Sequence, residues 1–312
     1  MDRKPRYRGI MTAACTPLDA DGRVVAQAVR EHVDAQIRAG ITGIVPIGGT
    51  GEFISLTDDQ RLAMVEATVE AANGRVPVIA GVLHPGLQDT VRASRAYLKA
   101  GADAVMVVTP YYYRPTQAGI VDYFRHINDA VDGELVLYEI PYRTGVSLLP
   151  ETVQRIVEQT RTVAIKACNP DLAQQMRVAE AVGQRIAILT GEEAVFPLHI
   201  AMGAVGGILA GSNLFPRVWT RIFELADAGR LAEATELHKL LQPATDALYA
   251  EPNPAPLKAA MNLLELNAGT VITPILEASP ACIARLRGVL PQALALEQRL
   301  AGESVSRAPP TL

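Results

Sequence analysis

The chain has 312 residues, of which 49% are hydrophobic and 20% are charged, so it is long enough to bury a large core. Its net charge of -4 and isoelectric point near 5.8 give no electrostatic support for a role in binding nucleic acid. No apolar run reaches the ~18 residues that a membrane-spanning helix needs, and no signal-peptide pattern follows the first residues. The cysteines, Cys15, Cys168 and Cys282, are odd in number and widely spaced, which argues against a disulfide framework. We therefore expect a cytoplasmic protein.

Short apolar runs alternate with longer amphipathic segments along most of the chain. The apolar runs predict strands at residues 9–15, 43–47, 76–80, 104–108, 135–140, 163–166, 186–189 and 206–210. The segments between them have helical spacing, at residues 24–39, from Thr57, at 87–99 and 117–130, from Pro150, from Asp171, at 193–201 and from Phe215. Continuously apolar strands joined by helices indicate a parallel sheet covered on both faces. About eight such units favour a closed (β/α)8 barrel, the TIM barrel, over an open sheet.

The alternation stops after the eighth unit. Residues 226–250, 256–266 and 280–300 all have helical patterns, and residues from Gly302 onward resemble a loose tail. The sequence therefore predicts a catalytic barrel over residues 1–225 and a C-terminal helical domain over residues 226–312.

Two reactive side chains stand at the ends of neighbouring predicted strands. In a (β/α)8 barrel, catalytic groups collect at the carboxyl ends of the strands. Tyr138 closes the fifth strand and Lys166 closes the sixth. A lone lysine at a strand end is more often a solvated boundary residue, but here Tyr138 lies on the adjacent strand. Burial disfavours the ammonium form of a lysine and so makes its amine a better nucleophile. We interpret the pair as a lysine that forms a Schiff base and a phenol that moves protons.

Other strand ends carry candidate binding groups. Gly49 and Thr50 follow the second strand in a glycine-rich turn whose amides suit a carboxylate, although a simple tight turn is the commoner structure. Arg143 follows the fifth strand and could clamp a carboxylate, or could be an ordinary surface arginine. Glu192 and Glu193 follow the seventh strand as a possible carboxylate pair, or simply open a helix.

The sequence gives little support for a metal site, a nucleotide-binding site or a cysteine nucleophile. The histidines show no metal-ligand spacing, and no dinucleotide or P-loop pattern follows the first strand. Among the cysteines, only Cys168 is a plausible reactive group, and packing is its commoner role.

Several motifs together resemble one enzyme family. They are Gly49-Thr50-Gly51-Glu52, Thr109-Pro110-Tyr111-Tyr112, Tyr138 with Pro141, Arg143-Thr144-Gly145, Ile165-Lys166 and Gly191-Glu192-Glu193-Ala194. The chain resembles the dihydrodipicolinate synthase / N-acetylneuraminate lyase family of class I aldolases, from Thr16-Pro17 to Glu251-Pro252-Asn253-Pro254.

The resemblance implies a role for each matching residue. Lys166 would form a Schiff base with pyruvate or another 2-oxo acid, and Tyr138 would shuttle protons. Thr50 and neighbouring amides would bind the 2-oxo acid carboxylate, and Arg143 would bind a carboxylate of the second substrate. Ile208 would line the pyruvate pocket. Tyr112 would cross a subunit interface to join the proton relay, because the family is typically a tetramer of tight dimers. No metal or organic cofactor is implied, and the partners would be a 2-oxo acid and an aldehyde.

The departures from the family pattern keep three functions open. Gly49 stands where the synthase branch has a threonine that links the two tyrosines, and Ala167-Cys168-Asn169-Pro170 replaces the synthase's Glu-Ala-Thr-Gly. The first hypothesis is a Schiff-base lyase that joins or cleaves a 2-oxo acid and an aldehyde. The second is a dehydratase or aldolase for 2-keto-3-deoxy sugar acids. The third is a paralogue that binds a 2-oxo acid without turnover.

Overall fold

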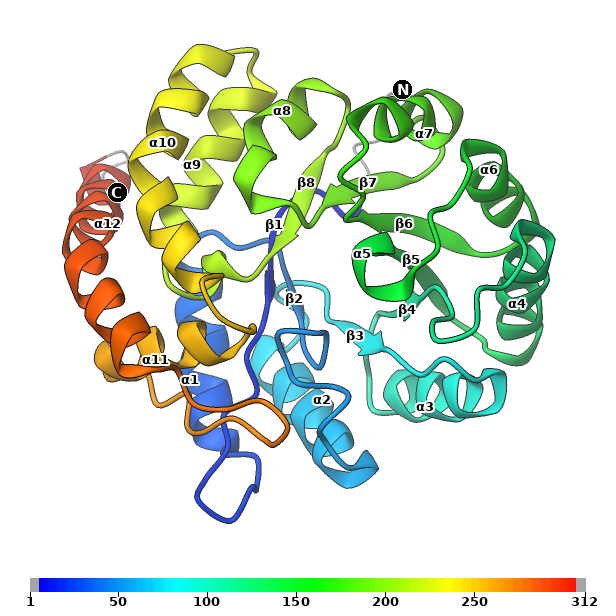
Figure 1. Cartoon of the computed structure of the whole chain (residues 1–312), viewed down its shortest axis with the longest axis horizontal. Helices are drawn as coiled ribbons and strands as arrows, with labels where there is room; N and C mark the ends of the chain where they lie inside the picture. The colour runs from blue at the N-terminus through cyan, green and yellow to red at the C-terminus, as the bar shows by residue number, and fades with distance from the viewer. Residues whose placement is uncertain (1–5, 307–312) are drawn as a thin grey trace, which may run out of the picture.

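The computed structural model describes residues 6–306, which form a (β/α)8 barrel with helices added after it (Figure 1). The strands lie parallel, in the order β2-β1-β8-β7-β6-β5-β4-β3. Their bounds are β1 (Gly9–Ala13), β2 (Gly43–Val45), β3 (Ile79–Val82), β4 (Ala104–Val108), β5 (Glu134–Glu139), β6 (Thr162–Ala167), β7 (Ala187–Thr190) and β8 (Gly206–Leu209). Each of the predicted strands is present.

The barrel closes between β2 and β3 through fewer contacts than elsewhere. An isolated parallel bridge pairs Ile44 with Val78. The Ile44 amide donates to the Pro77 carbonyl over 3.0 Å, and the Gly81 amide donates to the Pro46 carbonyl over 3.1 Å. Pro46 and Pro77 have no N–H to contribute, which limits a regular ladder here.

The barrel helices surround the strands in Figure 1. They are α1 (Ala26–Arg38), α2 (Asp58–Ala72), α3 (Leu87–Lys99), α4 (Gln117–Ala130), α6 (Pro150–Gln159), α7 (Leu172–Val182), α8 (Phe196–Ala201) and α9 (Pro216–Asp227). The short helix α5 (Pro141–Thr144) lies inside this ring, near β5. The capping box expected at Thr57 is present, because the Thr57 hydroxyl accepts from the Gln60 amide and the Gln60 side chain accepts from the Thr57 amide.

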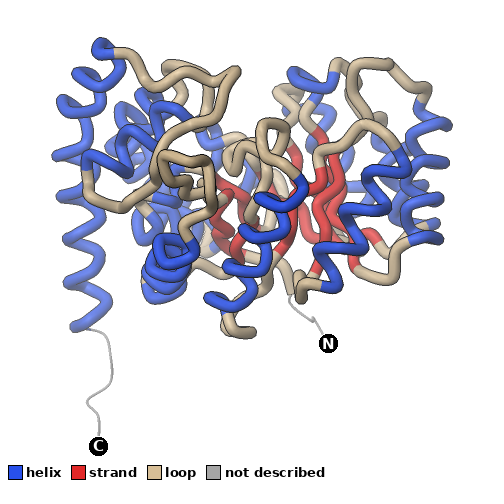
Figure 2. The backbone as a smooth tube through the Cα atoms, turned by 90° about the horizontal axis from the view of Figure 1, so that it is seen from below, coloured by secondary structure: helices blue, strands red, loops and turns tan. Residues whose placement is uncertain are grey.

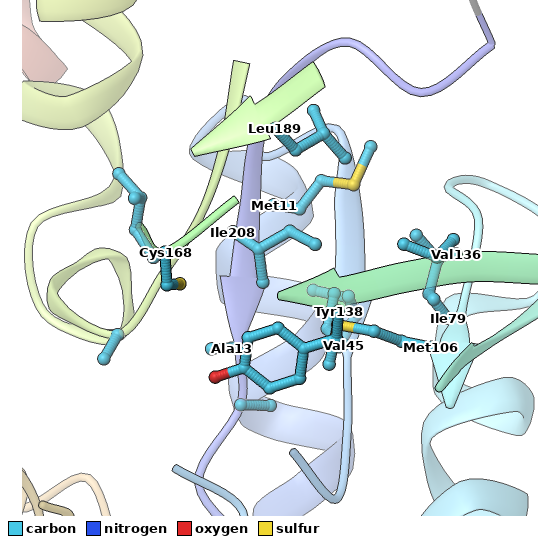
Figure 3. Packing of buried hydrophobic residues seen from close by; sticks show 14 of the residues in the cluster. Met11, Ala13, Val45, Ile79, Met106, Val136, Tyr138, Cys168, Leu189 and Ile208 are labelled. Carbon is cyan, nitrogen blue, oxygen red and sulfur yellow. The ribbon is translucent and has the colours of Figure 1, made fainter. Parts of the chain in front are cut away.

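Alternate residues of the strands fill the barrel interior. Figure 3 shows side chains from different strands meeting there, among them Met11 of β1, Met106 of β4, Leu189 of β7 and Ile208 of β8. All four are at most 1% exposed. Tyr138 lies among the same residues in Figure 3, so the fifth strand directs this phenol inward.

The C-terminal helices pack beside one edge of the barrel. They are α10 (Leu231–Leu248), α11 (Ala255–Leu263) and α12 (Pro280–Ser306). α10 contacts α8 and α9, and α12 contacts α9, α10 and α11. Figure 2 shows the long helix that leads to the C-terminus at the outer edge, away from the strands.

The structure differs from the sequence-based expectations in four main places. β3 runs over Ile79–Val82, so the strand expected at residues 76–80 begins three residues later. The helical pattern at 226–250 is broken between α9 and α10, where Gly229 has a φ of +76°, a left-handed conformation typical of helix ends. α5 was not expected, since four residues are too few to show a period. α12 continues to Ser306, so the first part of the expected tail is helical, and the rest of that tail lies outside the described residues.

Candidate active site

Lys166 and Tyr138 lie side by side at the carboxyl end of the barrel strands. Lys166 on β6 and Tyr138 on β5 are register partners, so the pairing of the two strands places their Cα atoms side by side. The Lys166 Nζ atom lies 4.7 Å from the centre of the Tyr138 ring. Only 8% of Lys166 and 6% of Tyr138 are exposed. The amine is therefore inside the protein and faces the phenol, as the Schiff-base interpretation requires.

Burial shifts the proton affinities of both groups in directions useful for catalysis. Desolvation lowers the pKa of Lys166 below its ordinary value. Desolvation also raises the pKa of Tyr138 well above its ordinary value. A larger share of the lysine is thus neutral and nucleophilic, while the phenol keeps its proton and can donate it.

These shifts predict the pH dependence of Schiff-base formation. Only the neutral amine attacks a ketone, so the rate should rise with pH and level off before the pKa of 10.5 that is ordinary for lysine. The rate of borohydride-trapped adduct formation with pyruvate, measured from neutral to alkaline pH, checks this expectation. A rate that keeps rising through the range of an exposed lysine would contradict it.

A small pocket joins the lysine to most of the residues expected at the site. Its volume is about 50 Å³. Its lining includes Lys166, Tyr138, Thr50, Gly49, Arg143 and Ile208, together with Ala13, Ile140, Tyr142, Cys168, Gly191, Ala210, Tyr249 and Asn253. The structure thus brings together six of the seven side chains and backbone positions proposed from the sequence.

Gly191 is required by the close packing around the lysine. A Cβ atom at this position would lie 2.2 Å from the Cys168 sulfur and 2.9 Å from the Lys166 Cε. Such contacts are too short for real side chains, so only glycine leaves the lysine in place. Burial raises the pKa of Cys168 to about 12, so this thiol is a neutral packing group.

One side of the pocket presents hydrogen-bond donors. The Asn253 side-chain amide donates to the Thr50 hydroxyl oxygen over 3.0 Å, which leaves the Thr50 proton free to donate into the pocket. Arg143 lies on α5, which begins at Pro141 and ends at Gly145 with a φ of +73°. Arg143 is exposed and lines the pocket, so its guanidinium can approach an anion.

A larger pocket adjoins the first on its outer side. It has a volume of about 310 Å³ and shares Gly49, Tyr138, Ile140, Arg143 and Asn253 with the inner pocket. The Tyr111 hydroxyl donates to the Leu83 carbonyl over 3.0 Å and fixes one wall of this outer pocket. The two pockets together offer a reacting lysine at the bottom and room for a second molecule above it.

Tyr112 does not belong to either pocket of the single chain. It is 89% exposed, has a φ of +74° and packs edge-to-face on Tyr113 with 5.4 Å between ring centres. The expectation that Tyr112 enters a site across a subunit interface remains a prediction.

The sequence-based reasoning missed the contribution of the C-terminal helices. Tyr249 and Asn253 follow α10 yet line the inner pocket. Residues 251–254 matched a family motif, but they follow a helix, and the barrel rule indicates a role only for residues at strand ends. Tyr142, which stands next to Arg143 on the unexpected α5, was also missed.

Glu192 and Glu193 lie behind the pocket wall. The Tyr142 hydroxyl donates to Glu192 over 3.3 Å. Glu193 opens a short 3-10 helix (Glu193–Val195), and its Oε1 accepts from the Gly211 amide over 2.8 Å and from the Tyr249 hydroxyl over 3.1 Å. Burial raises the pKa of both carboxyl groups. The expected helix-opening role is confirmed for Glu193, which in addition holds a pocket residue.

Residues 6–306 contain no group of three or more His, Cys, Asp or Glu side chains placed to hold a metal ion. The same part of the chain has no helix long and apolar enough to span a membrane.

Comparisons with known proteins agree on one family. The family model described as the dihydrodipicolinate synthetase family matches residues 6–292. The chain is 38% identical over 285 residues to a 4-hydroxy-tetrahydrodipicolinate synthase of Pelobacter propionicus, covering 91% of this chain and 98% of the relative. It is 40% identical over 275 residues to the enzyme of the same name from Sorangium cellulosum, covering 88% and 91%. A solved dihydrodipicolinate synthase from Acinetobacter baumannii, described as chloride-inhibited and complexed with pyruvate, superposes with a TM-score of 0.88 at 29% identity, covering 92% and 98%.

Proposed function

Because this chain belongs to the dihydrodipicolinate synthetase family, we propose that it is a lyase whose Lys166 forms a Schiff base with pyruvate or a related 2-oxo acid. The observation that supports this most is the buried Lys166 amine 4.7 Å from the Tyr138 ring. The relatives are named 4-hydroxy-tetrahydrodipicolinate synthase. Our first proposal for the reaction is therefore the joining of pyruvate to aspartate semialdehyde.

The proposed chemistry begins with attack of the Lys166 amine on the ketone carbon. Water leaves and an imine forms, and its positive charge makes a proton on C3 acidic. Loss of that proton gives an enamine, whose C3 attacks the aldehyde carbon to make the new carbon–carbon bond. Hydrolysis of the imine then returns the free lysine. Tyr138, whose proton burial retains, would deliver and accept protons at the imine and at the aldehyde oxygen.

The two pockets suggest where the carboxylates bind. Thr50, with its proton free and the Gly49 backbone beside it, would bind the 2-oxo acid carboxylate in the inner pocket. Arg143 lines both pockets and would bind a carboxylate of the aldehyde substrate. Ile208 would pack against the small 2-oxo acid chain. The reaction needs no metal or organic cofactor in this proposal.

A dehydratase or aldolase that acts on 2-keto-3-deoxy sugar acids is the second candidate. Gly49 supplies no hydroxyl where the synthase branch has a threonine, so the proton relay between Tyr138 and Tyr112 lacks one member. A sugar acid would use the same imine but lose water or cleave its own chain, which makes the missing hydroxyl less damaging.

We also propose a subunit arrangement and a division of the chain. Tyr112 is 89% exposed, and we propose that it crosses a subunit interface of a homotetramer built from two tight dimers. We propose residues 1–225 as the catalytic barrel and residues 226–312 as the helical domain, although α9 continues to Asp227.

Borohydride trapping with pyruvate tests the central proposal. The protein is incubated with pyruvate and reductant, digested, and analysed by mass spectrometry. We expect the peptide that contains residue 166 to gain the mass of one reduced pyruvate imine. Turnover is then compared between pyruvate with aspartate semialdehyde and a panel of 2-keto-3-deoxy sugar acids. Turnover of the sugar acids alone would favour the second candidate, and trapping without any turnover would favour a paralogue that only binds. The absence of an adduct would refute all three.

A further inference from the structure

Two tyrosine hydroxyls in the lining of the inner pocket already donate their protons to carboxylates. The Tyr249 hydroxyl donates to Glu193 Oε1 over 3.1 Å, and the Tyr142 hydroxyl donates to Glu192 over 3.3 Å. A phenol has one proton and two lone pairs, so each of these oxygens is left to accept hydrogen bonds. Both tyrosines line the pocket, and neither carboxylate is part of that lining.

The bond between Tyr249 and Glu193 is held on several sides. Glu193 is 3% exposed, and its Oε1 also accepts from the Gly211 amide. The Glu193 carbonyl oxygen lies 2.7 Å from His238 Nε2, on α10. Since α10 ends next to Tyr249, the same helix is attached to the Glu193 segment at two points. These contacts hold Glu193 in place, so the fold fixes the direction in which the Tyr249 hydroxyl donates its proton.

The pocket as a whole is divided by polarity. Thr50, Tyr138 and Arg143 present donors, and donors suit a carboxylate and a carbonyl oxygen. Tyr249 and Tyr142 add acceptors to the same lining. A substrate made only of carboxylate, carbonyl and methyl groups has nothing to donate to them, and would leave these acceptors unpaired when water is displaced.

We propose that Tyr249 is a specificity-determining residue that accepts a hydrogen bond from a hydroxyl or ammonium group of the second substrate, and that Glu193 is the residue that positions it. The inference rests on the proposed Schiff-base function and deepens it, because it names the chemical group that the aldehyde or sugar-acid chain must carry. The donor can come from the ammonium of an amino aldehyde or from a hydroxyl of a sugar-like chain.

Matched aldehydes test the proposal and separate the two sources. With pyruvate as the other substrate, aspartate semialdehyde is compared with succinic semialdehyde, which lacks the ammonium group. Glyceraldehyde is compared with propionaldehyde, which lacks the hydroxyls. We expect kcat/KM to favour the donor-bearing member of one pair by about 10-fold, the size expected for the loss of one hydrogen bond.

The variants assign the preference to these two residues. Tyr249→Phe should bring the ratio of the two kcat/KM values in the preferred pair close to one. The main cause should be a higher KM for the donor-bearing aldehyde. Glu193→Gln keeps an acceptor oxygen for Tyr249 and should retain the ratio, whereas Glu193→Leu frees the Tyr249 proton and should lose it. Tyr113→Phe, at an exposed tyrosine outside both pockets, is the matched control.

Trapping of pyruvate by each variant reports that the lysine site is intact. If no adduct forms with the natural protein, the proposed function fails, which is a different result from failure of the inference. A wild-type ratio near one in both pairs, a ratio unchanged in Tyr249→Phe, or no turnover of any of the four aldehydes would overturn the inference. Because Tyr249→Phe removes one oxygen only, it tests the proposal even where Glu193→Leu does not fold.

Discussion

Replacement of Lys166 by alanine is expected to eliminate the borohydride-trapped pyruvate adduct and to lower kcat/KM by roughly 10⁴-fold or more, as for loss of a covalent nucleophile in other enzymes. Of the four lysines within residues 6–306, Lys166 is the only one that lines the pocket. Lys258, the other buried lysine of the described chain, is engaged with the Glu52 carboxylate and the Thr270 carbonyl. No second amine is therefore placed to replace the first among residues 6–306.

Two further variants make the Lys166 result specific. Lys166→Met has a side chain of similar length without the amine, so it should lose the adduct equally while filling the same buried space. Lys99→Ala, at an exposed lysine in the last turn of α3, should retain the adduct and the activity. Circular dichroism confirms that each variant is folded. An adduct that persists on another peptide of Lys166→Ala would contradict the assignment.

Replacement of Lys258 by methionine is expected to reduce the free energy of unfolding by about 3–5 kcal/mol. The Lys258 ammonium lies 2.5 Å from the Glu52 carboxylate, and both side chains are completely buried. Removal of one partner leaves a carboxylate in the interior without its counter-charge. Glu52 also accepts from the Ile272 amide over 2.8 Å, so the pair connects the Gly49–Glu52 turn to a C-terminal loop.

Urea denaturation of a double-mutant cycle measures this effect. Glu52→Gln combined with Lys258→Met removes both charges and should recover much of the stability lost in the single variant. Lys239→Met is the matched control, because the Lys239–Glu236 pair is 61% and 73% exposed and should contribute less than about 1 kcal/mol. Equal losses in Lys258→Met and Lys239→Met would mean that the buried pair has no special role.

The regular part of the fold was predictable from hydrophobic periodicity. α3, α4 and β4 have the bounds that the sequence indicates, because apolar spacing and flanking glycines act locally. α5 was not predictable from a period, although Pro141 and Gly145 mark its ends. The break between α9 and α10 depends on one glycine with a positive φ inside an otherwise continuous helical pattern.

The candidate site was predictable only where it follows from strand order. Tyr138 and Lys166 close adjacent strands, so the barrel rule alone brings them together. Tyr249 and Asn253 reach the pocket from a loop more than 80 residues further along the chain than Lys166, and no local pattern encodes that contact. The hydrogen-bond direction of Tyr249 depends on Glu193, for which the sequence had indicated a carboxylate pair or a helix start.

The contacts of Asn253 and Lys258 with the turn at residues 49–52 bear on how this enzyme can be re-engineered. A chimera that takes its helices after α9 from a relative would replace three pocket contacts in one step. It would exchange Asn253, which bonds to Thr50, Lys258, which pairs with Glu52, and Tyr249. Directed evolution of substrate range therefore needs libraries that vary the turn and the C-terminal segment together. Grafting only the turn at residues 49–52, or only the C-terminal segment, would combine pocket residues of two parents that do not contact each other correctly.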